Sequence, residues 1–120
     1  MSQQIYTFEA LESWFGGYRP SWFSYPKEIL TEAQQIYLQK KIYRLEIEPN
    51  SLLLITKGGK ENFYTTVERF PHQLEIRSSV SDKNFGQAVG VAGFFLLEEL
   101  FEQNIHWLST GIYPKPKPTR

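Results

Sequence analysis

The stretch NFGQAVGVAGFFLLEELFEQN, residues 84–104, decides the fold of this chain. On a helical wheel of about 100° per residue, its large apolar side chains fill about half of the circumference and leave a narrow polar strip. Gly86, Gly90 and Gly93 project near the centre of the apolar half, although glycine lowers helix stability by up to about 1 kcal/mol relative to alanine. We expect a β-sheet packed closely against this helix, with a helix pair or a bound ligand as the alternative.

The residues before this helix, 42–80, predict four β-strands. Apolar and charged side chains alternate in IYRLEIE, which is typical of a half-buried strand. LLLIT lacks this alternation and predicts a central strand, and NFYTTVERF and LEIRSSV complete the set. Because each connection is only a few residues long, we expect a four-stranded antiparallel β-meander. Ser81 or Asp82 is the candidate cap of the helix of residues 82–105, which would lie across the apolar face of the sheet. The candidates for the opposite, charged face are Arg44, Glu46, Glu48, Glu68, Glu75 and Arg77.

The first 41 residues predict two short helices and a loop. Thr7 is a candidate cap for a helix over FEALESWF, which Gly16-Gly17 would end. Thr31 and Gln34 form a capping-box pattern that predicts a second helix through about Lys40. The fold class is therefore α+β, a four-stranded antiparallel meander with a long C-terminal helix on one face and two short N-terminal helices.

The loop between the two short helices is rich in aromatic residues. Tyr18, Trp22, Phe23 and Tyr25 lie in it, and Trp14 comes just before it. Two interpretations stay open: these rings plug one end of the core, or they form an exposed recognition surface.

The chain reads as one domain over residues 1–120. Its length of 120 residues and its 41% of hydrophobic residues suffice for one core, and no change in composition marks a second unit. Residues 112–120 form a tail rich in proline and lysine, typical of a polyproline-like segment. The sequence leaves open whether the protein is a monomer or a homodimer.

Charge and composition narrow the classes of partner. Thirteen basic and thirteen acidic side chains give a formal net charge of zero, so we expect neither a nucleic-acid partner nor a membrane-surface partner. The absence of cysteine fits a cytoplasmic location. The first residues, MSQQIYTFEALESW, lack the pattern of a signal peptide, and the longest apolar run, residues 88–97, is too short to span a bilayer.

No pattern in the sequence predicts an enzyme. The two histidines, His72 and His106, lie far apart and lack carboxylates at metal-ligand spacing. KGGK at residues 57–60 leads into a strand, whereas a phosphate-binding loop leads into a helix. We therefore expect no catalytic residues, no metal and no cofactor.

The order of elements between Tyr43 and Asn104 resembles that of small immunity proteins of bacterial polymorphic and contact-dependent toxin systems. The hairpins in EPNSLLLITKGGKENFYTTVERF and the following aromatic-rich helix, which ends near Phe94, Phe95 and Phe101, carry this resemblance. It implies a cytosolic, non-catalytic protein that binds a cognate toxin and covers its active site.

Two groups of residues are candidates for partner binding, because tight interfaces use aromatic and arginine anchors within a complementary charged field. They are Trp14, Tyr18, Arg19, Trp22 and Tyr25 around the aromatic loop, and Glu46, Glu48, Glu68 and Glu75 on the charged face of the sheet. One alternative function is a small-ligand domain with an aromatic-lined pocket between sheet and helix. Another is a structural or adaptor subunit that docks through PKPKP.

Overall fold

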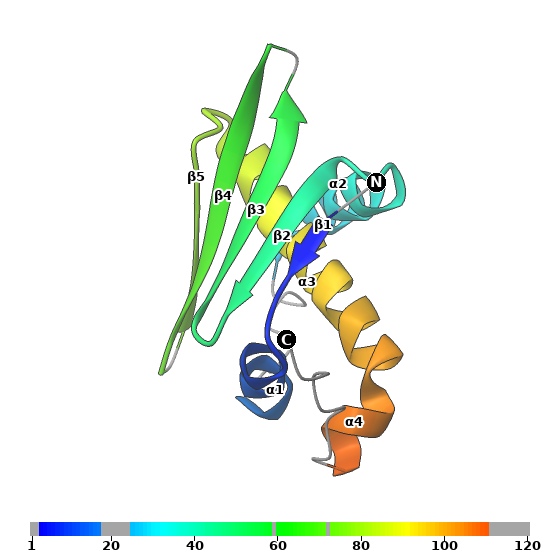
Figure 1. Ribbon diagram of the computed structural model, residues 1–120. Coiled ribbons are helices and arrows are strands. Elements are labelled where there is room, and N and C mark those ends of the chain that lie inside the picture. The colour runs from blue at the N-terminus through cyan, green and yellow to red at the C-terminus, as the bar shows by residue number, and fades with distance from the viewer. Residues whose placement is uncertain (1–2, 18–24, 59, 72, 111–120) are drawn as a thin grey trace.

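A computed structural model describes residues 3–17, 25–58, 60–71 and 73–110 of the chain. It is an α+β fold in which a sheet lies in front of a long helix (Figure 1). In chain order the elements are β1 (Gln3–Ile5), α1 (Phe8–Gly17), α2 (Lys27–Leu38), β2 (Ile42–Glu48), β3 (Ser51–Gly58), β4 (Glu61–Phe70), β5 (Gln73–Ser78), α3 (Lys83–Gln103) and α4 (Ile105–Thr110).

The sheet has five strands in the order β1-β2-β3-β4-β5. The predicted antiparallel meander is present as β2 to β5, and β3 is the middle strand of the five-stranded sheet. The prediction of a four-stranded, purely antiparallel sheet is wrong, because β1 adds a fifth strand that pairs parallel to β2, with Gln4 opposite Leu45. This three-residue strand is too short to show a period, and its partner lies about 40 residues away in the sequence.

The three helix glycines lie against the sheet, as expected. A Cβ atom built on Gly86 would lie 2.8 Å from Ser78 Cβ, and one on Gly90 would lie 2.7 Å from Ile76 Cδ1. A Cβ on Gly93 would lie 2.5 Å from Leu54 Cδ2. Each distance is shorter than van der Waals contact, so glycine is what lets α3 approach the sheet this closely.

The inner face of the sheet, which packs on α3, carries the buried side chains of Leu45, Ile47, Leu52, Leu54 and Val67. A β-bulge in β2 shifts its register against β3 between Ile42 and Arg44 and turns Ile42 into the core as well. Tyr43, which we expected on the same face as Leu45, is half-buried at this bulge. Inward and outward side chains therefore alternate from Arg44 to Glu48, and the bulge breaks this alternation before Arg44.

The second helix starts earlier than predicted. It begins at Lys27 after Pro26, so Thr31 lies inside the helix and forms no cap. At its end, Lys40 adopts a φ of 54°, the Lys41 N–H donates to the Ile36 carbonyl at 3.1 Å, and the Lys40 N–H donates to the Tyr37 carbonyl at 3.2 Å. This is a Schellman ending with lysine in the position that glycine usually holds.

The other helix caps match the sequence. The Thr7 hydroxyl accepts from the Ala10 N–H at 3.1 Å and starts α1. The Asp82 carboxylate accepts from the N–H groups of Asn84 and Phe85 and starts α3, which ends at Gln103 before the short helix α4. Leu108 of α4 is buried against the core.

Candidate functional site

The face of the sheet opposite α3 is the candidate site, and we call it the outer sheet face. In Figure 1 it faces the viewer, and none of the described helices crosses it. The strand register places its side chains in rows across the sheet. Its main members are Ile5, Arg44, Glu46, Glu48, Leu53, Ile55, Tyr64, Glu68, Phe70, Glu75 and Arg77.

Apolar side chains lie on three strands of this face. Tyr64 of β4 is 51% exposed, Ile5 of β1 is 39% exposed, and Phe70 near the end of β4 is 40% exposed. Leu53 and Ile55 of β3 lie between them and are half-buried, with Ile55 directly opposite Tyr64. A central strand with apolar residues on both sides explains why LLLIT shows no alternation.

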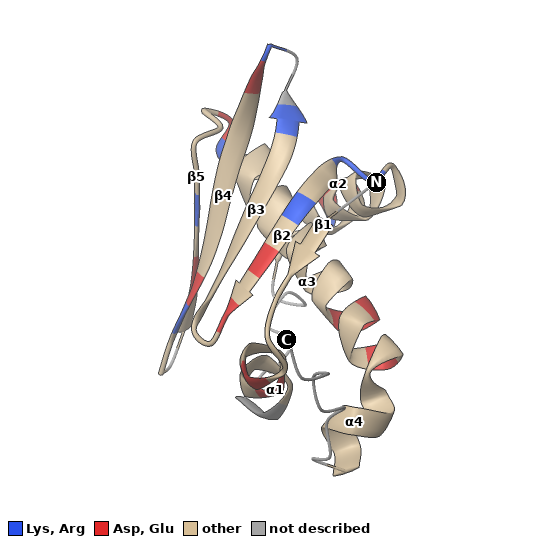
Figure 2. Cartoon of the chain, viewed as in Figure 1, with Lys and Arg blue, Asp and Glu red and all other residues tan. Residues whose placement is uncertain are grey.

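Glutamates gather at one end of the outer sheet face, near the turn between β2 and β3 (Figure 2). Glu48 lies opposite Ser51, Ser51 lies opposite Glu68, and Glu68 lies opposite Glu75, so one row across four strands carries three carboxylates. Like charges directly opposite each other destabilise a sheet. The sequence therefore places negative charge here at a cost to the fold.

Arginines neutralise only part of this charge. Arg44 Nε lies 2.8 Å from Glu46 Oε2, and Arg77 Nε lies 2.7 Å from Glu75 Oε1. The hydrogen bond and charge of Glu75, together with the charge of Glu68, raise the pKa of Arg77 above its ordinary value. Within the described ranges, Glu48 and Glu68 have no basic side chain within salt-bridge distance. This end of the face is therefore complementary to a cationic group.

The structure brings part of the aromatic group to the same end of the sheet, but on its inner side. Trp14 is completely buried, its Nε1–H donates to the Glu48 carbonyl at 2.6 Å, and the Arg69 guanidinium carbon lies 4.6 Å from the centroid of its ring. Arg69 also donates to the Ser13 carbonyl at 2.9 Å and to the Pro49 carbonyl at 2.6 Å. Trp14 thus anchors α1 to the β2–β3 turn, and we omit it from the proposed interface.

The structure says less about the other candidates around the aromatic loop. Tyr25 is half-buried, and this burial raises the pKa of its hydroxyl. Tyr18, Arg19 and Trp22 lie outside the described residues, as does the tail of residues 112–120. The two interpretations of the loop therefore stay open for those three residues, and so does the adaptor hypothesis that rests on PKPKP.

Sequence reasoning identified the carboxylates of the outer sheet face but missed its apolar residues. Tyr64 and Phe70 alternate with inward residues along NFYTTVERF, so the period of β4 was the available signal. Ile5 offered no signal, because only the parallel pairing of β1 brings it beside Glu46. Arg44 and Arg77 were expected on the charged face, and their ion pairs confirm that position.

The contact between sheet and helix bears on the alternative of a ligand cavity there. Side chains of Ile76 and Leu54 occupy the space beside Gly90 and Gly93, which closes the interface at these two positions. A pocket does occur elsewhere, between α2 and α3 on the side of α3 away from the sheet. In the described part of the chain, no cluster of three or more acidic or histidine side chains is placed to hold a metal ion.

Two findings complete the description of the site. Among the helices that the structure describes, none has both the length and the apolar character needed to cross a bilayer. Comparisons of the chain with protein-family models, with curated proteins and with solved structures find no match. The geometry of the outer sheet face and the chemistry of its side chains are therefore what indicate a function.

Proposed function

We propose that this chain is a non-catalytic module that binds a protein partner through the outer sheet face. The observation that carries the proposal is a sheet face that none of the described helices covers and that bears exposed Ile5, Tyr64 and Phe70 together with the carboxylates of Glu48 and Glu68. Interfaces combine aromatic and aliphatic anchors with complementary charge at their edges. A basic surface with an apolar centre is the partner that fits.

We further propose that the partner is a bacterial toxin and that the chain acts as its immunity protein in the cytoplasm. The support is the resemblance in element order between Tyr43 and Asn104, together with a chain that contains no cysteine. Binding would cover the active site of the toxin, and a basic active-site cleft would meet the glutamate row. Such attraction accelerates association and weakens as salt is added.

The test is capture of the partner from the organism that encodes the chain, with the tagged protein as bait and mass spectrometry as the readout. A single stoichiometric protein partner that is toxic when expressed alone is the expected result. Co-expression with the bait should relieve the toxicity. A captured partner with no toxicity would reject the immunity role while keeping the binding role.

Charge-reversal variants locate the interface. Glu48→Lys and Glu68→Lys should each weaken association by about tenfold or more, because they place a cation against a cationic partner. Glu61→Lys is the matched control, since it makes the same charge change on the exposed start of β4, at the opposite end of the sheet. Equal effects of all three variants would mean that net charge, and not the outer sheet face, governs binding.

A further inference from the structure

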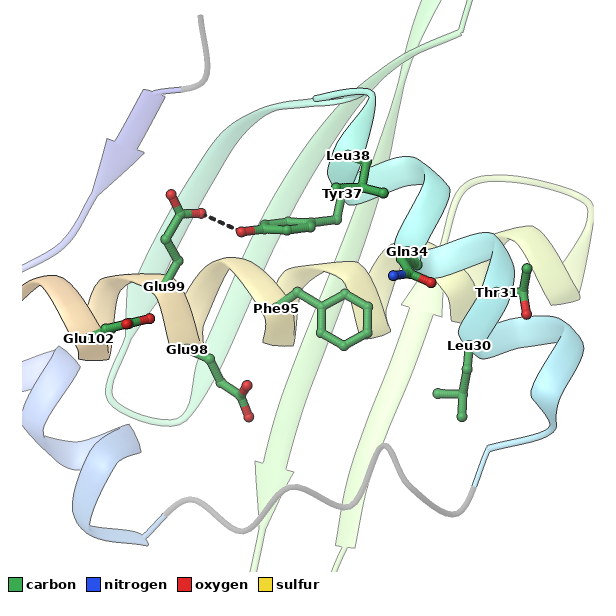
Figure 3. A pocket seen from close by; sticks show the side chains of 9 residues that line it. All are labelled: Leu30, Thr31, Gln34, Tyr37, Leu38, Phe95, Glu98, Glu99 and Glu102. Carbon is green, nitrogen blue, oxygen red and sulfur yellow. Dashed lines mark hydrogen bonds between the residues drawn. The ribbon is translucent and has the colours of Figure 1, made fainter.

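A pocket of about 540 Å³ lies between α2 and α3, on the opposite side of the molecule from the outer sheet face (Figure 3). Its volume is within the range of small-molecule sites. α2 contributes Leu30, Tyr37 and Leu38 to its lining, and α3 contributes Phe95. Figure 3 shows Tyr37 and Glu99 reaching toward each other from the two helices, and their oxygens form a hydrogen bond of 3.0 Å.

The pocket has an apolar and aromatic wall. The rings of Tyr37 and Phe95 meet edge to face, with centroids 5.9 Å apart and an interplanar angle of 67°. Leu38 is 60% exposed at the rim. An apolar part of a ligand would remove this surface from water, and the aromatic rings would attract a cation held near them.

Among the described residues that line the pocket, the charged ones are Glu98, Glu99 and Glu102, all from the last turns of α3. The residues that α2 adds are uncharged. Within the described ranges, none of the three glutamates has a basic side chain within salt-bridge distance. The pocket therefore carries a negative charge that the described part of the chain does not neutralise.

This charge is placed where it disfavours the helix. Carboxylates near the C-terminus of a helix oppose its dipole, and Glu98 repels Glu102 one turn away. The last turn of α3 contains no basic residue to offset them. Burial, the hydrogen bond to Glu99 and the charges of Glu99 and Glu102 all raise the pKa of Tyr37, in keeping with this negative field.

We propose that the α2–α3 pocket binds a small organic cation that carries an apolar arm. The ammonium or guanidinium group would face the end of the pocket that Glu98, Glu99 and Glu102 line, and the arm would lie against Leu38, Tyr37 and Phe95. A bare metal ion fits less well, because among the described residues these carboxylates do not converge as a metal site and the wall is apolar. An anion would meet three like charges.

Phenethylammonium is a suitable probe, and binding is followed by ¹H–¹⁵N NMR titration of the full chain. We expect saturable shifts centred on the amides of α2 and of the second half of α3. Phenylacetate has the same arm with a negative charge, and ethylammonium has the charge without the ring. Both should bind at least tenfold more weakly, because phenylacetate lacks the positive charge and ethylammonium lacks the aromatic ring.

Variants test which side chains of the pocket bind the cationic group and which contact the apolar arm. Glu98→Gln combined with Glu102→Gln should weaken phenethylammonium binding by about tenfold, since two attractive charges are lost. Leu38→Gln should weaken it several-fold without disturbing the core, because Leu38 is largely exposed. Glu32→Gln is the matched control, as Glu32 is exposed on α2 and does not line the pocket. It should leave the affinity unchanged.

Three outcomes would overturn the proposal. They are equal binding of phenethylammonium and phenylacetate, an unchanged affinity in the double glutamate variant, and the absence of any saturable shift at α2 and α3. The proposal does not depend on the function proposed for the outer sheet face. Loss of partner binding in Glu68→Lys with phenethylammonium binding retained would separate the two.

Discussion

At the scale of single residues, Thr56 is the described residue whose buried side chain has an unsatisfied polar atom. It is buried in β3, and in the described structure its hydroxyl has no hydrogen-bond partner. Valine has nearly the same shape without the hydroxyl, so Thr56→Val removes an unpaired polar group from the core. We expect the free energy of unfolding to rise by about 1 kcal/mol, measured by chemical denaturation.

Thr65 provides the matched control for this substitution. It is equally buried on the neighbouring strand β4, but its hydroxyl lies 2.9 Å from the Ser78 hydroxyl and forms a hydrogen bond. Thr65→Val should therefore lower the free energy of unfolding by about 1 kcal/mol. If both variants lose the same stability, the Thr56 hydroxyl has a partner such as a buried water, and the prediction is wrong.

The raised pKa of Tyr37 predicts that the free energy of unfolding depends on pH. This pKa is raised in the folded protein by burial, by the hydrogen bond to Glu99 and by the charges of Glu99 and Glu102. A raised pKa means that the unfolded chain releases this proton at a lower pH than the folded protein does. The contribution of Tyr37 to the free energy of unfolding is therefore complete below the ordinary tyrosine pKa, and it is lost as the pH rises through the pKa of the folded state. We expect the stability difference between the wild type and Tyr37→Phe to narrow above about pH 10.

The measurement is urea denaturation of both proteins between pH 8 and pH 11. All other ionisable groups are common to the two chains, so their effects cancel in the difference. A difference that stays constant over this range would show that Tyr37 titrates alike in the folded and unfolded states.

At the scale of elements, the contact between α3 and β3 is limited by Gly93. Alanine there would gain up to about 1 kcal/mol of helix propensity, but its Cβ would lie 2.5 Å from Leu54 Cδ2 in a filled core. We expect Gly93→Ala to lower the free energy of unfolding by about 1–3 kcal/mol, the usual cost of overpacking. Chemical denaturation measures this cost.

Leu54→Val tests whether that contact is the cause. Valine is shorter at this position, so alone it should cost about 1 kcal/mol by leaving space, yet it makes room for the alanine Cβ. The double variant should therefore lose less stability than the two single losses together. Strict additivity would mean that the cost of Gly93→Ala arises elsewhere.

The elements that the sequence predicted are those specified by local patterns. The meander β2 to β5, the caps at Thr7 and Asp82 and the glycine face of α3 follow from alternation, capping residues and helical period. β1 was missed because a three-residue strand has no period and its parallel partner is distant in sequence. The bulge in β2 was missed for a related reason, since only packing against β3 and α3 makes Ile42 turn inward.

The features of the candidate site also divide into those that a local sequence pattern predicts and those that depend on contacts between elements. The glutamates of the outer sheet face were predicted because alternation along one strand already places Glu46 and Glu48 on the side away from the core. The row that joins Glu48, Glu68 and Glu75 depends on register between strands, which no single strand reveals. The α2–α3 pocket was not predicted at all, because it arises from two helices about 60 residues apart, as the Tyr37–Glu99 hydrogen bond illustrates.

At the scale of the whole molecule, the sheet separates two negatively charged surfaces. The outer sheet face lies on one side, and the α2–α3 pocket lies beyond α3 on the other (Figure 3). Gly86, Gly90 and Gly93 hold α3 tightly against the sheet between them. The two surfaces share no residue, so substitutions on one side are expected to act independently of those on the other.

A four-way comparison tests this independence. Glu68→Lys should weaken capture of the protein partner by about tenfold or more and leave phenethylammonium binding unchanged, whereas Glu98→Gln with Glu102→Gln should do the reverse. The triple variant should show both losses, each within about twofold of its separate value, because the sites are not in contact. Added salt should weaken partner capture in the wild type more than in Glu68→Lys, which has already lost attraction to the basic surface. A loss of partner capture in the pocket variant would instead mean that the cation that fills the pocket belongs to the partner, and that the interface extends around the molecule to α2 and α3.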